Sequence, residues 1–231
     1  MTKSKRTKEF AKLLDKKKSY TFSEAIELLK RVPKTKFDET VEISFKLHVN
    51  PKETSVSIRG TVSLPHGTGK VRKVAVFCKG EDEKKAKEAG ADFVGSVDLI
   101  KKVGDGWCDF DVAISTPDMM KELSRLGKVL GPRGLMPNPK GGTVTTDIGK
   151  AVSEVKKGKV EFRMDKQANI HVPIGKLSFE TPSLLENGTK LIDAVEHSKP
   201  PVVKGAFIKS ISLSSTMGPG LKLDLANWRS K

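Results

Sequence analysis

The chain has 231 residues, which is enough for one large domain or two ordinary ones, each with a substantial hydrophobic core. Its 43 Lys and Arg residues against 28 Asp and Glu residues give a formal net charge of +15, and a hydrophobic content of 36% excludes a purely disordered basic tail. Cys78 and Cys108 are too few for a disulfide framework, and no apolar run approaches the roughly 20 residues of a membrane span. The composition therefore predicts a folded cytoplasmic protein with a polyanionic partner and no membrane contact.

The positive charge is densest at the start of the chain. Residues 1–20 hold eight basic and two acidic residues, whereas residues 21–67 hold seven and six. Because no acidic run elsewhere offsets this basic arm, the charge pattern favours a nucleic acid over an acidic protein as the partner.

The first predicted elements are a helix and two half-buried strands. The helix is capped by Thr21 or Ser23 and ends before Pro33. Residues 41–49 and 55–59 then alternate between apolar and polar side chains, which predicts two strands. Strands with one polar face belong to an antiparallel or mixed sheet that is covered on one side only.

The pattern changes after residues 64–70, which are too rich in Gly and Pro for a regular element. Short strands and helices alternate from there to Gly158. The order is typical of a parallel, doubly wound sheet. The predicted strands are residues 73–78, 92–94 and 111–115, and the predicted helices are residues 82–89, 117–126 and 147–157.

Alternating strands return after Gly158. Strands are predicted at residues 160–164, 170–174, 207–213 and 221–225, a turn at 166–169 and a helix at 184–195. The simplest interpretation is a split domain. Residues 1–67 and 159–231 share one sheet, and residues 68–158 form an inserted α/β domain, so that the chain crosses twice between the two.

Motifs of enzymes are absent from this sequence. Gly69-Lys70 is followed by Val71 rather than by Ser or Thr, so it does not match a phosphate-binding P-loop. Gly104-Asp105-Gly106 does not match a dinucleotide-binding GxGxxG motif, because it opens no helix after a strand. The four histidines, His48, His66, His171 and His197, lack metal-ligand spacing. The sequence therefore predicts no catalytic residue, no metal and no cofactor. A nucleotide-dependent enzyme built on the α/β insert is the alternative, and it lacks a phosphate loop.

Two segments have unusual compositions. Residues 130–142 form either a plain connecting loop or a semi-rigid loop that brings Arg133 and Lys140 close to phosphates. Residues 214–220 form either a plain β-turn or a small-residue surface that an RNA backbone approaches, with hydroxyls for ribose and Met217 as an apolar contact.

Together these fragments resemble the large-subunit ribosomal protein L-one family of the bacterial type. The matching stretches occur in the family's order over nearly the whole chain, and five in register are highly specific. They are Lys36–Glu42, Leu64–Lys70, Ala89–Gly95, Leu130–Lys140 and Ser215–Pro219.

The resemblance implies an α+β split domain with an inserted Rossmann-like three-layer α/β domain. It implies a non-catalytic, monomeric component of the large ribosomal subunit. Such a protein binds large-subunit rRNA at the mobile stalk, assists release of tRNA from the exit site and represses translation of its own operon mRNA. A dedicated mRNA regulator with the same binding surface is a further alternative.

The resemblance also assigns site residues. The expected RNA contacts are Lys36, Phe37, Thr40, Glu42, Lys46, Lys166, Ser212, Ser214, Thr216, Met217 and Gly218, with Arg133 and Lys140 as a possible second contact. One position departs from the family, which commonly has Gly in the turn where this chain has Ala168. Because Asn tolerates positive φ, we expect the turn to be rebuilt one residue along, at Asn169.

Overall fold

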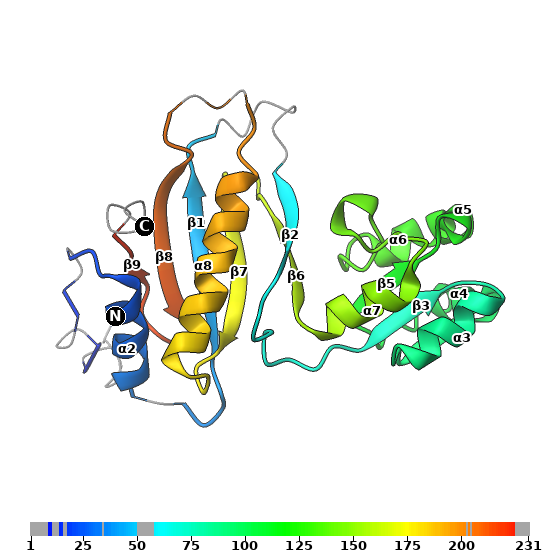
Figure 1. Ribbon diagram of the computed structural model, residues 1–231, viewed down its shortest axis with the longest axis horizontal. Coiled ribbons are helices and arrows are strands. Elements are labelled where there is room, and N and C mark those ends of the chain that lie inside the picture. Colours follow the sequence, from blue (N-terminus) through cyan, green and yellow to red (C-terminus); the bar gives the residue numbers. More distant parts are fainter. Residues whose placement is uncertain are drawn as a thin grey trace. The chain divides into compact units, whose positions relative to one another are not determined.

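The computed structural model describes residues 9–10, 14–15, 18–33, 35–49, 58–201, 203 and 205–224. The chain divides into two compact units (Figure 1). Unit 1 comprises the described residues up to Gly69 and from Glu161 onward, and unit 2 comprises Lys70–Val160. The mixed α and β composition with several sheets agrees with the expected fold class. Of the basic arm, only Lys18 among the basic residues lies within the described part.

Unit 1 is built on a four-stranded antiparallel sheet with the strand order β7-β1-β8-β9. Strand β1 (Thr40–Leu47) lies in the middle, between segments that follow it by more than a hundred residues. The other strands are β7 (Asn169–Lys176), β8 (Ile208–Ser215) and β9 (Leu221–Lys222). The predicted alternation in β1 is confirmed, because Val41, Ile43, Phe45 and Leu47 are buried.

Two helices pack against the apolar face of this sheet. They are α2 (Phe22–Arg31) and α8 (Thr181–His197), and Figure 1 shows α8 running along the strands. Gly188 of α8 lies so close to the Phe22 ring and to Ile43 that an added Cβ would meet both. Thr21 and Glu24 form a capping box at the start of α2, as the Thr21 cap predicts. The opposite face of the sheet keeps its polar side chains.

A two-stranded sheet pairs β2 (Arg59–Ser63) with β6 (Lys159–Arg163), the strand on which the chain passes from unit 2 back into unit 1. Most of the strand predicted at residues 55–59 lies outside the described residues, and the described strand begins at Arg59. A Cβ on Gly60 would overlap the Phe162 ring, so a larger residue has no room there.

Unit 2 holds a three-stranded parallel sheet in the order β4-β3-β5. The strands are β3 (Val74–Phe77), β4 (Phe93–Gly95) and β5 (Val112–Ser115). Ala75 and Phe77 belong to one hydrophobic core, whereas Val74 and Val76 belong to another, so both faces of the sheet are covered. Helices α3 (Glu81–Glu88) and α7 (Ile148–Lys156) supply one core, and α4 (Val97–Gly104) with residues 117–130 supplies the other.

The helices of unit 2 differ from the prediction in two places. Helix α4 has no predicted counterpart. The single helix predicted for residues 117–126 is instead a series of short turns, namely η1 (Pro117–Met119), α5 (Met120–Leu123), η2 (Ser124–Leu126) and α6 (Gly127–Leu130). The Ser124 hydroxyl donates to the Met120 carbonyl at 2.7 Å, a bond that competes with the helical ladder. Thr116 makes no side-chain capping bond to η1.

Within the described ranges, no helix is both long enough and apolar enough to cross a membrane.

Candidate nucleic-acid interface

The polar face of the unit 1 sheet is a strip of small and charged side chains along β1 and its two neighbours. Glu42 is paired with Pro173 and Ser214, Ser44 with His171 and Ser212, and Lys46 with Asn169 and Ser210. From Thr40 to Lys46 the strip is about 20 Å long at the usual rise per residue of a strand. The pairing places the predicted Glu42, Lys46, Ser212 and Ser214 on one surface.

Hydrogen bonds already orient part of this strip. Ser44 Oγ lies 3.0 Å from His171 Nδ1, and Lys46 Nζ donates to the Gln167 carbonyl at 2.6 Å. The predicted Lys166 is exposed in the turn beside Gln167. Lys166 therefore lies near the Lys46 end of the strip, at the end opposite Thr40.

The Thr40 end of the strip carries two exposed apolar side chains. Phe37 is 54% exposed and Met217 is 56% exposed. They come from segments 180 residues apart, but the segments are joined because Glu39 Oε2 accepts a hydrogen bond from Met217 N at 3.2 Å. Lys36 is exposed beside Phe37. The structure thus brings the predicted Phe37 and Met217 to one edge of the sheet.

The turn that carries Met217 is fastened to the first residue of β1. Thr216 N donates to the Thr40 carbonyl at 3.0 Å, and Thr40 N donates to Thr216 Oγ1 at 3.0 Å. The Thr216 hydroxyl also donates to the Thr40 carbonyl, at an O···O distance of 3.3 Å. The hydroxyl predicted to contact RNA therefore has protein partners for its proton and for one acceptor position.

Glycine at position 218 leaves room for the Ser215 hydroxyl in this turn. A Cβ added there would stand 2.2 Å from Ser215 Oγ. Gly218 N also donates to the Ser215 carbonyl at 3.0 Å, which closes the turn. A side chain at position 218 would displace the Ser215 hydroxyl.

The turn before β7 differs from the expectation. Ala168 itself adopts the left-handed conformation, with φ at 60°, so the expected shift to Asn169 is wrong. Asn169 is the first residue of β7 and pairs with Lys46, which requires extended backbone. Asp165 Oδ1 accepts from Gln167 N at 2.8 Å and Asn169 N at 2.7 Å, and these bonds hold the turn. Burial alone would raise the pKa of Asp165, but the hydrogen bonds from Asn169 and Gln167 outweigh it and lower that pKa.

Lys176 joins the polar strip although the sequence prediction omitted it. Strict alternation in β7 would place Lys176 on the apolar face, together with Ile170, Val172 and Ile174. A bulge at Val41/Glu42 adds one residue to β7, so Lys176 pairs with Thr40 instead. Lys176 Nζ then donates to Thr40 Oγ1 at 3.0 Å. Gly175 is a local hint of this bulge, because an isolated Gly in a strand often marks one, but the register that places Lys176 beside Thr40 is visible only in the pairing of two distant strands.

The second predicted contact lies in unit 2. Arg133 is exposed in a turn that precedes Gly134, whose φ is +70°. Thr143 Oγ1 accepts from Asn138 N at 2.7 Å, and Ser115 N donates to the Thr143 carbonyl at 2.9 Å, so the loop is bound to the end of β5. The side chain of Lys140 lies outside the described part. That Arg133 and Lys140 contact RNA stays a prediction.

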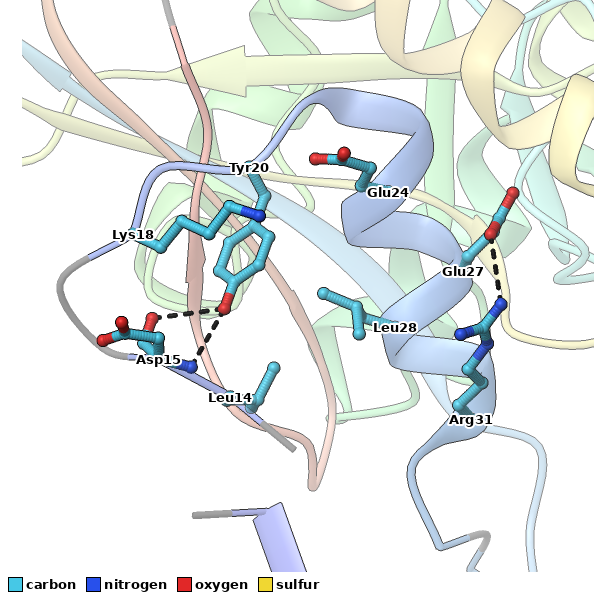
Figure 2. Close-up of a pocket in the computed structure, with 8 residues that line it drawn as sticks. All are labelled: Leu14, Asp15, Lys18, Tyr20, Glu24, Glu27, Leu28 and Arg31. Atoms are coloured by element: carbon cyan, nitrogen blue, oxygen red, sulfur yellow. Dashed lines mark hydrogen bonds and ion pairs between the residues drawn. The ribbon is translucent and has the colours of Figure 1, made fainter. Parts of the chain in front are cut away.

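No alternative chemical site competes with the strip among the described residues. Groups of three or more metal-ligating side chains are absent from the described ranges. Asp109 and Asp111 bind Lys73 and Lys70 as surface ion pairs. A pocket of about 640 Å³ is lined by α2 and by the segment before it. Figure 2 shows the side chains that line this pocket. Its lining mixes three acidic with two basic side chains, and Arg31 and Glu27 form an ion pair there, so no single ligand charge is favoured.

A polar sheet face with exposed apolar side chains at one edge is a surface typical of nucleic-acid-binding proteins. The profile of the Ribosomal protein L1p/L10e family matches residues 28–219. The large ribosomal subunit protein uL1 of Protochlamydia amoebophila (strain UWE25) is 55% identical over 222 residues, which cover 96% of this chain and 94% of that protein. The chain therefore belongs to the Ribosomal protein L1p/L10e family, and it is a ribosomal protein and not an enzyme.

Proposed function

We propose that this chain is a structural component of the large ribosomal subunit and binds large-subunit rRNA through the sheet-edge surface. This surface comprises the polar face of β7, β1 and β8, the exposed Lys36 and Phe37, and the turn Thr216–Gly218. The 55% identical relative is a protein of the large ribosomal subunit, which supports the large-subunit assignment. One observation carries the choice of surface. Phe37 and Met217, two of the four large apolar side chains exposed in the described part of the chain, belong to segments joined at one sheet edge.

The chemistry of this surface suits a folded RNA. An aromatic ring and a thioether provide stacking and apolar contact for a base or ribose. Ser212 and Ser214 can exchange hydrogen bonds with 2′-hydroxyl groups, and the exposed Glu42 carboxylate can accept from ribose hydroxyls or base amines. Lys36, Lys46 and Lys166 bring positive charge to the rim, where phosphates would lie.

A titration against the cognate rRNA fragment and against a random RNA of equal length tests this proposal. At several salt concentrations, we expect a preference for the cognate fragment that persists while the affinity for both RNAs falls with salt. Sedimentation with large ribosomal subunits, followed by release at high salt, checks the assembly in which the protein acts. Equal affinity for both RNAs at every salt concentration would contradict the proposal.

Two finer roles follow from the family resemblance. Repression of the chain's own operon mRNA would use the same sheet-edge surface, so this mRNA should compete with the rRNA fragment for binding. Assistance in releasing tRNA from the exit site would use unit 2, where Arg133 is exposed. For that role, Arg133→Ala should slow tRNA release and leave rRNA affinity unchanged. A loss of rRNA affinity in this variant would contradict the division of roles between the units.

A further inference from the structure

We infer that Glu39 is a positioning residue for RNA recognition, because its buried carboxylate holds the Met217 turn in the arrangement that the RNA contacts. This inference rests on the proposed function. Glu39 lies outside the set of expected RNA contacts, and it is only 2% exposed, so its carboxylate is a component of the protein interior.

Three segments of the chain meet at Glu39. Glu39 Oε2 accepts from Ser215 Oγ at 2.5 Å and from Met217 N at 3.2 Å. The Glu39 carbonyl accepts from Leu177 N at 2.8 Å, which ties the same residue to the end of β7. A buried carboxylate is costly unless hydrogen bonds compensate it, and both of these donors to the carboxylate come from one turn.

The Met217 side chain needs such an anchor because it is more than half exposed. Its own packing does not fix its position, and the Met217 backbone is instead held through the hydrogen bond to Glu39. Gly218 contributes to the same arrangement, since a Cβ there would collide with the hydroxyl that Glu39 binds. Glu39, Ser215 and Gly218 are therefore one packed unit beneath Met217.

This arrangement predicts a selective defect. If the turn is released, only a fraction of molecules hold Met217 in the binding arrangement, and cognate affinity falls by that fraction. The Glu39 charge is buried within the protein, so its removal changes the attraction of phosphates little. Binding of random RNA, which depends on exposed cations, should therefore be unchanged.

The test compares Glu39→Gln with Asp38→Asn in the full-length chain. Both changes remove one carboxylate charge from neighbouring residues, but Asp38 is exposed and binds the Ser178 backbone and hydroxyl rather than the turn. We expect Glu39→Gln to weaken cognate rRNA binding by about 10-fold, because the amide oxygen accepts these hydrogen bonds without the charge that strengthens them in the carboxylate. Asp38→Asn should stay within about threefold of the wild type. The amide proton signal of Met217 should shift and exchange faster in Glu39→Gln, a change that a general loss of stability would not confine to this residue.

Ser215→Ala is the second variant, and it serves if Glu39→Gln does not fold. It removes one of the donors that the Met217 turn supplies to Glu39, and it should show the same selective loss to a smaller degree. Cognate affinity within about threefold of the wild type in these variants, despite a changed Met217 amide signal, would overturn the inference. An equal loss for cognate and random RNA would also overturn it. If the wild-type chain itself shows no preference for the cognate fragment, the proposed function fails instead, so the two failures are distinguishable.

Discussion

Thr40 and Thr216 are 176 residues apart and are bound to each other through both backbone and side chain, with Thr216 N donating to the Thr40 carbonyl and Thr40 N donating to Thr216 Oγ1. The Thr216 hydroxyl thus helps to hold the turn against β1 at the edge of the proposed RNA surface. Its second acceptor position is the one left for RNA.

The first prediction separates the hydroxyl of Thr216 from its methyl group. Thr216→Val keeps the shape of the side chain but leaves Thr40 N without its partner, so cognate rRNA binding should weaken by about 1–3 kcal/mol. Thr216→Ser keeps the hydroxyl and should bind nearly as well as the wild type. Fluorescence titration with the cognate fragment measures both, and a Val variant that binds like the Ser variant would contradict the role of the hydroxyl.

The second prediction concerns the two exposed apolar side chains. Phe37→Ala and Met217→Ala should each weaken cognate binding by about 1–3 kcal/mol, because each removes a surface for a base. Random RNA should bind both variants nearly as tightly as the wild type. Val97→Ala is the matched control, since Val97 is also exposed, at 41%, but lies on α4 of unit 2. A double-mutant cycle measures whether Phe37 and Met217 contact the same part of the RNA.

The third prediction tests Lys176, which the bulge in the β1–β7 pairing brings to the polar strip. One of the three ammonium protons binds Thr40 Oγ1, and two are left for phosphate oxygens. Lys176→Gln should therefore reduce the salt dependence of RNA binding by about one released counterion. Lys190→Gln removes an exposed charge from α8, on the other side of the sheet, and should leave the slope unchanged. If both variants show the same dependence of RNA affinity on salt concentration, Lys176 is not part of the RNA interface.

The fourth prediction distinguishes the two cysteines. Cys78 is buried, and this burial, with Glu83 and Asp82 nearby, raises the pKa of its thiol to about 11. At pH 8 only about one Cys78 thiol in a thousand would be the reactive thiolate. Iodoacetamide should label the half-buried Cys108 first in the native protein, and mass spectrometry after timed quenching measures the order. Rapid labelling of native Cys78 would contradict its burial.

The fifth prediction concerns acid stability. The hydrogen bond from Lys70 Nζ to Asp111, against the opposing effect of burial and with a contribution from Lys73 N, holds the pKa of Asp111 below its ordinary value of 3.8. Because the pKa of Asp111 is lower in the folded protein than in the unfolded chain, its ionised carboxylate stabilises the fold fully above the unfolded pKa. This stabilisation is lost as the pH falls through the folded pKa. Asp111→Asn should therefore lower the urea midpoint at pH 6 and lower it less at pH 3. A decrease in the urea midpoint that is as large at pH 3 as at pH 6 would contradict the role of the Asp111 carboxylate.

Local sequence signals predict most of the elements because they act over a few residues. Thr21 as the cap of α2 and the alternation in β1 both appear as expected. Helix α4 is missed although Leu99 and Val103, four residues apart, are buried at helical spacing and offer the periodic signal of a helix. The interruption of the helix predicted for residues 117–126 follows a side-chain bond at Ser124 that periodicity does not encode.

The site is predictable only in its parts. Alternation identifies the polar face of β1, and exposed residue types indicate Phe37 and Met217. The bond from Met217 to Glu39 and the placement of Lys176 depend on strand pairing across more than a hundred residues, which no local pattern records. Left-handed Ala168 likewise reflects the bonds of Asp165 to the surrounding turn rather than the propensity of Ala.

The central position of β1 also sets an order of events during translation. Its described partners are β7 and β8, so β1 leaves the ribosome long before either strand exists, whereas all three strands of the unit 2 sheet are made by Ser115. Nascent chains acquire structure from the amino terminus as segments become complete. Unit 2 can therefore assemble first, and the surface proposed to grip RNA is finished only when Gly218 has been synthesised. Nascent chains that stop short of β8 would lack that surface, so RNA capture is coupled to near-completion of synthesis.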